Sequence, residues 1–302
     1  MSGLPPRWER DVPLRERTSW RVGGPVQFIS HPADLEELRE DLALARRGAL
    51  PVFALGGGSN LLVSDRGYAG LMLRLPDAPT QPPPGARVAR ALLAAGASLS
   101  RVAEELAGAG WAGLEWAAGI PGTVGGAVVN NAGAFGGSID GVFRGARLLD
   151  PEGREQRWTA EQMAFAYRHS ALKGAEPTRH LLLEAEFALE RAAPERLRER
   201  IAENRIQRRA RTPRGASCGS VFRNPPGVNA GRLIAASGLA GTRRGDAQIS
   251  TRHANYILNL GCARAEEILA LIRLCRQRVR AAHGIELQLE VQLVGFSDVE
   301  LG

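Results

Sequence analysis

Two glycine-rich segments are the first candidates for a functional site. The sequence GGGSN occupies residues 56–60, and GIPGTVGGAVVNNAGAFGG runs from 119 to 137 without a charged side chain. Consecutive glycines can turn amide N–H groups toward a pyrophosphate, because no Cβ blocks the approach, and Ser59 and Asn60 add side-chain donors. The alternative is two tight turns packed against neighbouring strands. Two charge-poor segments in one chain favour a dinucleotide whose flat ring needs a close wall.

Neither segment matches a common nucleotide-binding fingerprint, and no metal site is predicted. GxGxxG followed by an acidic residue about 20 positions on is absent, and so is a Walker lysine. Cys218, Cys262 and Cys275 are too widely spaced for the usual zinc patterns, and their odd number argues against a disulfide framework. We expect buried free thiols. The five histidines show no HExxH or paired metal spacing.

The net charge of +7 raises the possibility of a nucleic-acid partner. Lys173 is the only lysine, however, so a general preference for arginine explains the charge more simply. The basic run over residues 203–215 also lacks interleaved aromatic side chains on which bases could stack. We therefore expect no nucleic-acid partner, and a basic surface suits anionic substrates such as phosphorylated nucleotides.

The sequence predicts a cytoplasmic protein with no membrane partner. The first 20 residues contain no apolar signal-peptide region, and no run of about 18 uncharged apolar residues occurs anywhere.

The elements that must position these segments fall into three predicted parts, residues 1–78, 79–192 and 193–302. Periodicity and end signals predict helices over 32–48, 100–110, 194–210, 231–239 and 264–283. Strands are predicted at 51–55, 61–64, 70–75, 87–98, 180–190, 255–261 and 285–295. A hairpin over 144–158 has its tip at Pro151 to Gly153, and Thr159 to Gln162 fits a capping box.

Motifs along nearly the whole chain resemble those of the UDP-N-acetylenolpyruvoylglucosamine reductases, in that family's order. They are TSWRVGG (18–24), VFALGGGSNLLVSD (52–65), GIPGTVGGAVVNNAGAFG (119–136), YRHSALK (167–173), CGSVFRNP (218–225), STRHANYILN (250–259) and LQLEVQLVG (287–295). The resemblance implies an α+β protein: a two-subdomain FAD-binding fold of the PCMH or vanillyl-alcohol-oxidase type, plus a C-terminal α+β substrate domain. It also implies FAD and NADPH as cofactors and reduction of a UDP-sugar enolpyruvyl ether to UDP-N-acetylmuramate, a peptidoglycan precursor.

The resemblance assigns roles to individual positions. Ser220 matches the family's proton donor, Arg168 and Glu290 match its other catalytic residues, and Tyr167 and Asn224 match substrate-binding positions. His253 is a further substrate-binding candidate. The positions assigned to FAD are Gly56, Gly57, Gly58, Ser59, Asn60, Gly119, Pro121, Gly122, Thr123, Gly125, Gly126, Ala132 and Gly133.

The three catalytic residue types suit the chemistry. Hydride delivered from flavin N5 to the terminal carbon of an enolpyruvyl group leaves an enolate beside a carboxylate, which an arginine fork can stabilise. Glu290 can hydrogen-bond the same group if it is protonated or beside Arg168, and a hydroxyl supplies the proton. Without the motifs, Glu290 reads as a solvated strand residue and Ser220 as a turn cap. His253 reads equally well as a buried structural histidine.

Some positions depart from the family's pattern. Arg223 stands where the family has lysine, and Ala171 where it has a bulky residue. The chain runs from Lys173 almost directly to the strand at 180–190, so it resembles a short form without the insertion that carries a tyrosine loop. Arg205, Arg208 and Arg211 are the candidates for the clamp on the UDP group. Lys173 is either retained for its compact ammonium or a chance survivor.

Two alternatives to the reductase remain. One is an FAD-dependent oxidase of the same fold acting on an alcohol or sugar, although no histidine that could tether FAD lies between His31 and His169. The other is an arginine-rich nucleic-acid-binding protein, which would not need uncharged glycine segments. For the reductase we expect the UDP-sugar and NADPH as partners, and a monomer, with a dimer left open.

Overall fold

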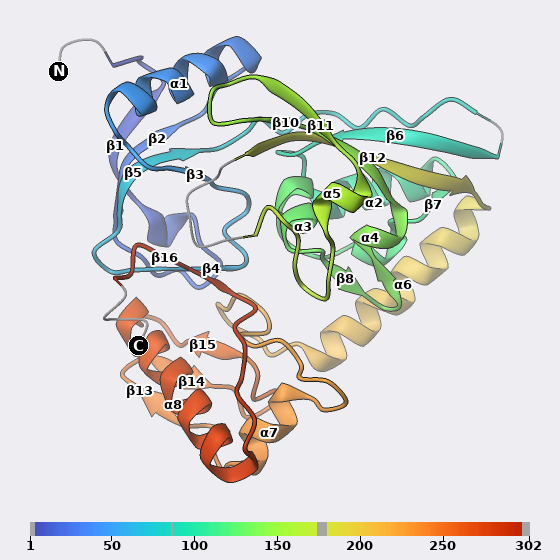
Figure 1. Ribbon diagram of the computed structural model, residues 1–302. Coiled ribbons are helices and arrows are strands. Elements are labelled where there is room, and N and C mark those ends of the chain that lie inside the picture. Colours follow the sequence, from blue (N-terminus) through green and yellow to red (C-terminus); the bar gives the residue numbers. More distant parts are fainter. Residues whose placement is uncertain (1–3, 86, 174–179, 298–302) are drawn as a thin grey trace. The chain divides into compact units, whose positions relative to one another are not determined.

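The computed structural model describes residues 4–85, 87–173 and 180–297, and the chain divides into two compact units (Figure 1). Unit 1 takes its residues from 1–9, 28–57 and 70–208, and unit 2 from 10–27, 58–69 and 209–302. Each unit is therefore discontinuous in sequence. The three-part division at residues 78 and 192 stays a prediction.

The described residues form a mixed α and β structure. Its helices are α1 (Leu35–Arg47), α2 (Leu99–Gly108), α3 (Val124–Val129), α4 (Ile139–Val142), α5 (Ala160–Met163), α6 (Pro194–Arg211), α7 (Ala230–Ala236) and α8 (Ala265–His283). Its strands are β1 (Trp8–Pro13), β2 (Pro25–Ser30), β3 (Val52–Ala54), β4 (Leu61–Val63), β5 (Tyr68–Leu73), β6 (Val88–Ala94), β7 (Trp111–Ala112), β8 (Gly133–Ala134), β9 (Gly137–Ser138), β10 (Phe143–Leu149), β11 (Glu155–Trp158), β12 (Leu181–Arg191), β13 (Arg243–Arg244), β14 (Ala247–Ile249), β15 (Ile257–Asn259) and β16 (Gln292–Val294).

Helix α1 and the sheet of order β1-β2-β5-β3 begin the fold. The Asp34 side chain caps the helix by accepting a hydrogen bond of 2.9 Å from Glu37 N, and Gly48 ends it, which confirms the predicted helix. Leu38 lies on the buried face of α1 and packs with Phe28 and Leu71 of the sheet. β3 runs parallel to β5, so the chain leaving β3 enters the first glycine segment at one end of this sheet.

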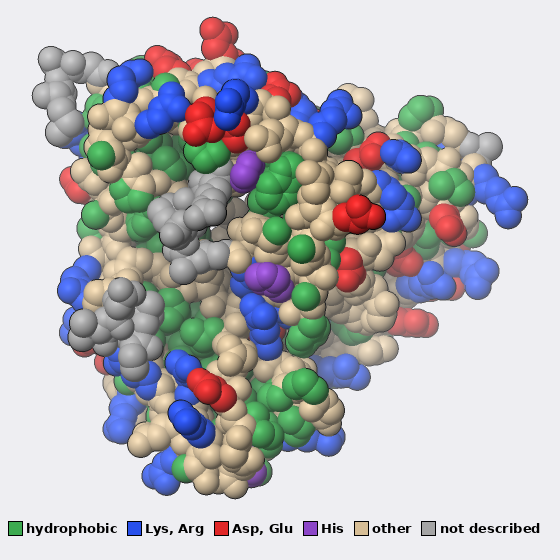
Figure 2. Space-filling view, viewed as in Figure 1, with side chains coloured by type: hydrophobic (Ala, Val, Ile, Leu, Met, Phe, Trp, Pro, Cys, Tyr) green, Lys and Arg blue, Asp and Glu red, His purple; other side chains and the backbone are tan. Residues whose placement is uncertain are grey.

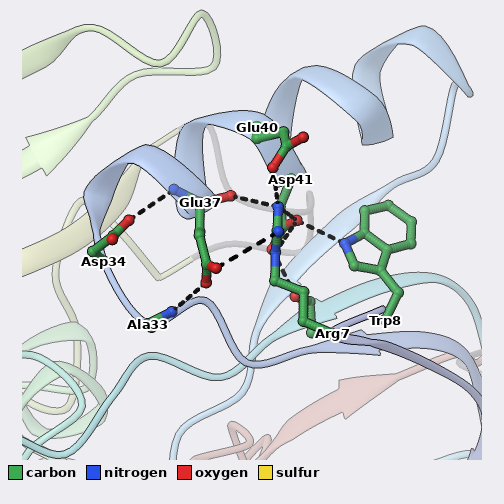
Figure 3. A network of polar contacts seen from close by, with 8 residues as sticks. Arg7, Trp8, Ala33, Asp34, Glu37, Glu40 and Asp41 are labelled. Atoms are coloured by element: carbon green, nitrogen blue, oxygen red, sulfur yellow. Dashed lines mark hydrogen bonds and ion pairs between the residues drawn. The ribbon is translucent and has the colours of Figure 1, made fainter. Parts of the chain in front are cut away.

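A buried carboxylate joins α1 to the start of the chain (Figure 3). Asp41 is fully buried and accepts hydrogen bonds from Trp8 Nε1 at 2.7 Å, Ser30 Oγ at 2.6 Å and Arg7 Nε at 3.0 Å. Arg7 also pairs with Glu40, which is exposed. Three donors compensate the Asp41 carboxylate for the loss of water.

A sheet whose strands all lie in unit 1 is antiparallel in the order β11-β10-β12-β6. The predicted hairpin is confirmed, with Leu149 opposite Glu155 at its closed end, and the predicted capping box of Thr159 and Gln162 is present at α5. Helices α2 and α3 lie against one face of this sheet (Figure 1), where Leu106 and Phe187 are fully buried in a shared core.

Unit 2 is built around α8 and the three-stranded sheet β13-β14-β15. Ile268, Leu271, Ile272 and Cys275 are buried on one face of α8, as its periodicity predicts. The helix ends at Gly284 in the left-handed conformation, with φ of 68°. β4 and β16 pair in parallel within this unit.

The predicted strand over 285–295 is only partly correct. Backbone pairing as a strand is confined to β16, whereas Leu289 makes a single bridge to Phe222, and both Glu290 N and Val291 N approach Val221 O. The alternation of side chains is real, but the partner segment at 221–222 is a loop. Alternating side chains show which residues of an extended segment share a face, but they do not show whether a neighbouring strand pairs with it along its whole length.

The cysteine prediction needs one correction. The three thiols are free, and Cys218 and Cys275 are buried, but Cys262 is exposed. Cys262 lies between β15 and α8, in a turn whose backbone is bonded to Asn259 and Asp246 side chains, so its own side chain is not needed for packing.

Basic and acidic side chains lie next to each other on the surface (Figure 2). On the face shown in Figure 2, Lys and Arg side chains are interspersed with acidic ones, and several arginines form ion pairs, such as Arg147 with Glu184 and Arg200 with Glu115. Among the described residues, no helix is long and apolar enough to cross a membrane, and no group of three or more potential metal ligands gathers.

The Asp41 network gives a stability prediction. Asp41→Asn removes the fully buried carboxylate that accepts from half-buried Arg7, and it puts an amide N–H₂ among donors. We therefore expect a loss of about 3 kcal/mol in the free energy of unfolding in urea. Glu40→Gln removes the exposed partner of the same arginine and should cost less than about 1 kcal/mol. Equal losses in the two variants would contradict the buried role of Asp41.

Candidate active site

The two glycine-rich segments meet within unit 1. A Cβ added to Gly57 would lie 2.7 Å from Gly122 Cα, and one added to Gly56 would lie 2.8 Å from Thr123 Oγ1. At Gly57 the obstacle is backbone, so only glycine permits the approach there, whereas a Cβ at Gly56 would require the Thr123 hydroxyl to move. The packing interpretation of the glycines is therefore correct at these two positions, and it brings the predicted FAD-binding segments side by side.

Further glycines of the second segment allow close packing on neighbouring elements. Gly125 N donates to Ala95 O at 2.8 Å, and a Cβ at Gly125 would come 3.0 Å from the Ala95 side chain. A Cβ at Gly137 would lie 2.2 Å from the Trp116 ring. Thr123 caps α3 by accepting from Gly126 N at 3.2 Å. The Thr123 hydroxyl therefore stabilises the start of α3, and Thr123 is also one of the predicted FAD-binding positions.

Other glycines of the same segment face open space. A Cβ at Gly136 would meet nothing within 4 Å, one at Gly119 would find only Arg208 at 3.8 Å, and one at Gly126 only Thr123 at 3.5 Å. Backbone that is tightly packed on one side and open on the other is what a closely approaching dinucleotide requires. The residues present are therefore compatible with FAD, and the assignment of Gly119 and Gly126 to the cofactor stays a prediction.

Arg168 is directed at the second glycine segment by hydrogen bonds to main-chain carbonyls. Its Nη2 donates to Gly133 O at 2.5 Å and its Nη1 to Asn131 O at 3.3 Å, and it lies 5.4 Å from the centre of the Tyr167 ring. A Cβ at Gly133 would lie 3.2 Å from Arg168 Nη1. The structure therefore brings the predicted arginine together with predicted cofactor position Gly133.

Asn131 holds this arrangement, and sequence reasoning missed it. The side chain is only 4% exposed. Its Nδ2 donates to Asp140 Oδ2 at 3.1 Å and to Ala166 O at 3.0 Å, and its Oδ1 accepts from Asp140 N at 3.1 Å. Burial raises the pKa of Asp140, but hydrogen bonds from Ser138 and Asn131 outweigh it and the net shift is downward. The Asn130–Asn131 pair inside an apolar segment was the available signal.

The first glycine segment continues into unit 2, where it supports Glu290. Gly58 has φ of 61°, and a Cβ there would lie 1.9 Å from Arg17 O. Asn60 Nδ2 donates to Glu290 O at 3.1 Å, and Asn60 O accepts from Gln292 N at 2.9 Å. The Asn60 side chain, predicted as a cofactor donor, is thus engaged with the backbone that carries a predicted catalytic residue.

Ser220 lies on a loop fixed at both sides in unit 2. The Cys218 thiol approaches Leu61 O at 3.4 Å, and Asn255, only 2% exposed, pairs its side-chain amide with Phe222 N at 2.9 Å and Phe222 O at 2.8 Å. Glu290 N donates to Val221 O at 2.9 Å. Ser220 and Glu290 therefore lie on adjoining backbone segments, and both side chains are half-buried.

The remaining predicted positions are placed less tellingly. Tyr167 in unit 1 is 55% exposed, and Asn224 in unit 2 is also exposed. The Asn224 Oδ1 accepts a hydrogen bond from Ala230 N at 3.0 Å. His253 is half-buried and packs against Tyr256 with ring centres 4.9 Å apart, and burial lowers its pKa. This environment suits a structural histidine. All three substrate-binding assignments stay predictions.

The arginines suggested as a UDP clamp differ among themselves. Arg205 is paired with Glu104 at 2.6 Å, Arg208 lies 5.2 Å from the centre of the Phe135 ring, and Arg211 is exposed at the end of α6. The predicted absence of a tyrosine-loop insertion concerns the chain after Lys173, and residues 174–179 lie outside the described residues.

Two family matches identify this chain as an FAD-binding protein with a second, C-terminal domain. Residues 26–159 match the family described as "FAD binding domain", and residues 211–294 match "UDP-N-acetylenolpyruvoylglucosamine reductase, C-terminal domain". The UDP-N-acetylenolpyruvoylglucosamine reductase of Chloroflexus aggregans is 44% identical to this chain. The alignment spans 96% of this chain and 99% of that protein. The reductase of Rubrobacter xylanophilus is 43% identical and covers 94% of each chain.

A solved structure agrees with these relatives. The crystal structure of UDP-N-acetylenolpyruvylglucosamine reductase from Thermus caldophilus superposes with a TM-score of 0.80 at 36% identity, over 95% of this chain and 99% of that one. The chain belongs to the UDP-N-acetylenolpyruvoylglucosamine reductase family. It is an FAD-binding oxidoreductase of peptidoglycan precursor synthesis that uses NADPH. The predicted fold class is confirmed, and the oxidase and nucleic-acid alternatives are set aside.

The contact between the glycine segments gives a prediction for cofactor binding. Gly57→Ala places a Cβ against the backbone of Gly122 and must push the two segments apart, so we expect loss of bound FAD and about 1–3 kcal/mol less stability in the FAD-free protein. Flavin absorbance after desalting and urea unfolding measure the two effects. Gly108→Ala, at the end of α2 where a Cβ would meet nothing within 4 Å, is the matched control; it should leave bound FAD unchanged and should not lower stability.

The thiols give a second prediction. Burial raises the pKa of Cys218 and of Cys275 to about 12, so at pH 8 only about one in ten thousand of either thiol is ionised. A thiol reagent should label Cys262 alone in the native protein and all three cysteines after unfolding. Rapid native labelling of Cys218, located by peptide mass, would show that the Ser220 loop opens readily.

Proposed function

We propose that Arg168, Ser220 and Glu290 carry the reduction of the enolpyruvyl ether of a UDP-sugar in this reductase. Bound FAD supplies hydride transfer between NADPH and the substrate. The protein's task is then to bind the enolpyruvyl group, to stabilise the enolate that forms, and to supply a proton.

The carbonyl contacts of Arg168 support its role. A guanidinium held by Gly133 O and Asn131 O keeps a fixed direction, and a preorganised cation stabilises a developing enolate and carboxylate without reorganising during the reaction. Because those carbonyls belong to the second glycine segment, the proposal places the cation beside the cofactor. This contact is the observation that carries the proposal.

Ser220 and Glu290 form the second part of the proposed machinery. In the proposal the Ser220 hydroxyl donates its proton to the substrate carbon next to the carboxylate, and Glu290 hydrogen-bonds the substrate's carboxylate. Their support is the backbone bond from Glu290 N to Val221 O, which ties the two residues into one local structure, together with the Asn255 bonds to Phe222. We also propose that the protein acts in the cytoplasm.

The activity is tested on the purified protein's visible spectrum. We expect a yellow protein whose flavin is released by acid, is bleached by NADPH without oxygen, and recovers its colour with UDP-N-acetylglucosamine enolpyruvate. A protein that retains no added FAD, or whose reduced flavin is not reoxidised by that substrate, would contradict the proposed reaction.

The proposed proton donor predicts a split between the two half-reactions. Ser220→Ala should leave the rate of flavin reduction by NADPH within about threefold and slow reoxidation by the enolpyruvyl substrate by at least about a hundredfold, because a proton donor acts only when the substrate is reduced. Rapid-mixing spectroscopy measures both. Ser237→Ala, on a hydroxyl that only bonds Leu233 O at the end of α7, is the matched control. Equal slowing of both half-reactions would rule out this role.

A further inference from the structure

The only lysine of the chain touches the backbone of the proposed catalytic arginine. Lys173 is half-buried, and its Nζ donates to the main-chain carbonyl of Arg168 at 3.2 Å. Its own amide N donates to Ser170 O at 3.0 Å, so the residue is fixed at both its main chain and its side chain. Lys173 therefore belongs structurally to the Arg168 turn.

The conformation of Arg168 explains why such a contact matters. Arg168 has φ of 56°, in the left-handed region, which costs a residue with a Cβ about 1–2 kcal/mol. It lies inside a tight turn in which Ala166 N donates to His169 O at 3.1 Å and His169 N to Ala166 O at 3.0 Å. A strained conformation persists only where surrounding contacts hold it.

Contacts at its two ends hold Arg168 in this conformation. At one end, Lys173 binds the main-chain carbonyl. At the other, Asn131 O and Gly133 O bind the guanidinium, while Asn131 Nδ2 also binds Ala166 O in the same turn. A loss at either end allows the turn to relax and the guanidinium to change direction.

The residue type suits this task. A lysine ammonium is a compact donor on a slim stem, whereas the guanidinium of arginine is a wide planar fork that needs space for its five N–H groups. Every other basic residue of this sequence apart from histidine is arginine. A half-buried position against a main-chain carbonyl is where the smaller ammonium has an advantage.

We propose that Lys173 is a positioning residue for the reduction, acting through Arg168. By holding the Arg168 carbonyl it keeps the left-handed turn closed, and it thereby fixes the direction in which the guanidinium meets the enolpyruvyl carboxylate. The inference rests on the proposed role of Arg168.

The test uses the FAD-loaded enzyme and rapid mixing. Lys173→Met keeps the stem and removes the donor, and we expect reoxidation by UDP-N-acetylglucosamine enolpyruvate to slow by about 10- to 100-fold, as for a small misplacement of a catalytic group. Flavin reduction by NADPH should stay within about threefold. Lys173→Arg should recover only part of the loss, because its fork does not fit the same carbonyl. Full recovery by arginine would overturn the argument for a compact ammonium.

A matched control and a double variant separate positioning from general damage. Arg144→Met removes another basic side chain that donates to a carbonyl in unit 1, Phe143 O at 2.8 Å, and should change neither half-reaction. In an Arg168→Ala background, Lys173→Met should slow reoxidation no further, because its effect passes through the missing guanidinium.

The outcomes distinguish the inference from the proposed function. Equal slowing of both half-reactions by Lys173→Met, or effects that multiply in the double variant, would overturn the positioning role alone. Unchanged reoxidation in Arg168→Ala would overturn the role of Arg168 in the proposed function. If Lys173→Met does not yield FAD-loaded protein, Lys173→Leu, which likewise has no donor, takes its place. Unchanged reoxidation in whichever of these variants is FAD-loaded would also overturn the inference.

Discussion

The close approach of backbone to backbone at Gly57 and Gly122 is the constraint on which the FAD-binding unit depends. It can form only where no Cβ intervenes, and it fixes the end of the β3 segment against the loop that opens α3. The carbonyls of the same second segment then bind the Arg168 guanidinium. The segment that packs against Gly57 therefore also sets the direction of the proposed catalytic arginine.

Buried asparagines hold the proposed catalytic residues in both units. An asparagine amide offers a donor and an acceptor in the same arrangement as a peptide group, so it can pair with backbone where no strand is available. Asn255 pairs in this way with Phe222 beside Ser220, and Asn131 bonds Asp140 and Ala166 beside Arg168. Because a buried unpaired amide is costly, these contacts specify loop conformations that apolar side chains could not.

Local patterns predicted the elements, and long-range partners decided the rest. Helix α1, the hairpin of β10 and β11, and the Gly284 end of α8 follow from periodicity, capping and turn residues close in sequence. The pairing of 285–291 could not be predicted because its partner, the loop at 221–222, is distant and irregular. For the candidate site, sequence motifs predicted Arg168, Ser220 and Glu290. The hydrogen bond from Asn60 to Glu290 could not be predicted, because it joins residues 230 positions apart and no local pattern indicates it.

The packing interpretation of the glycines holds at some positions of the second segment, whereas other positions leave room for the predicted cofactor. Gly125 and Gly137 press on Ala95 and Trp116, while Gly126 and Gly136 face open space. A backbone that must lie against protein on one side and approach a cofactor on the other cannot carry a Cβ in either direction. If FAD lies against the open positions, as predicted, both requirements together account for an uncharged, glycine-rich stretch inside an otherwise charged chain.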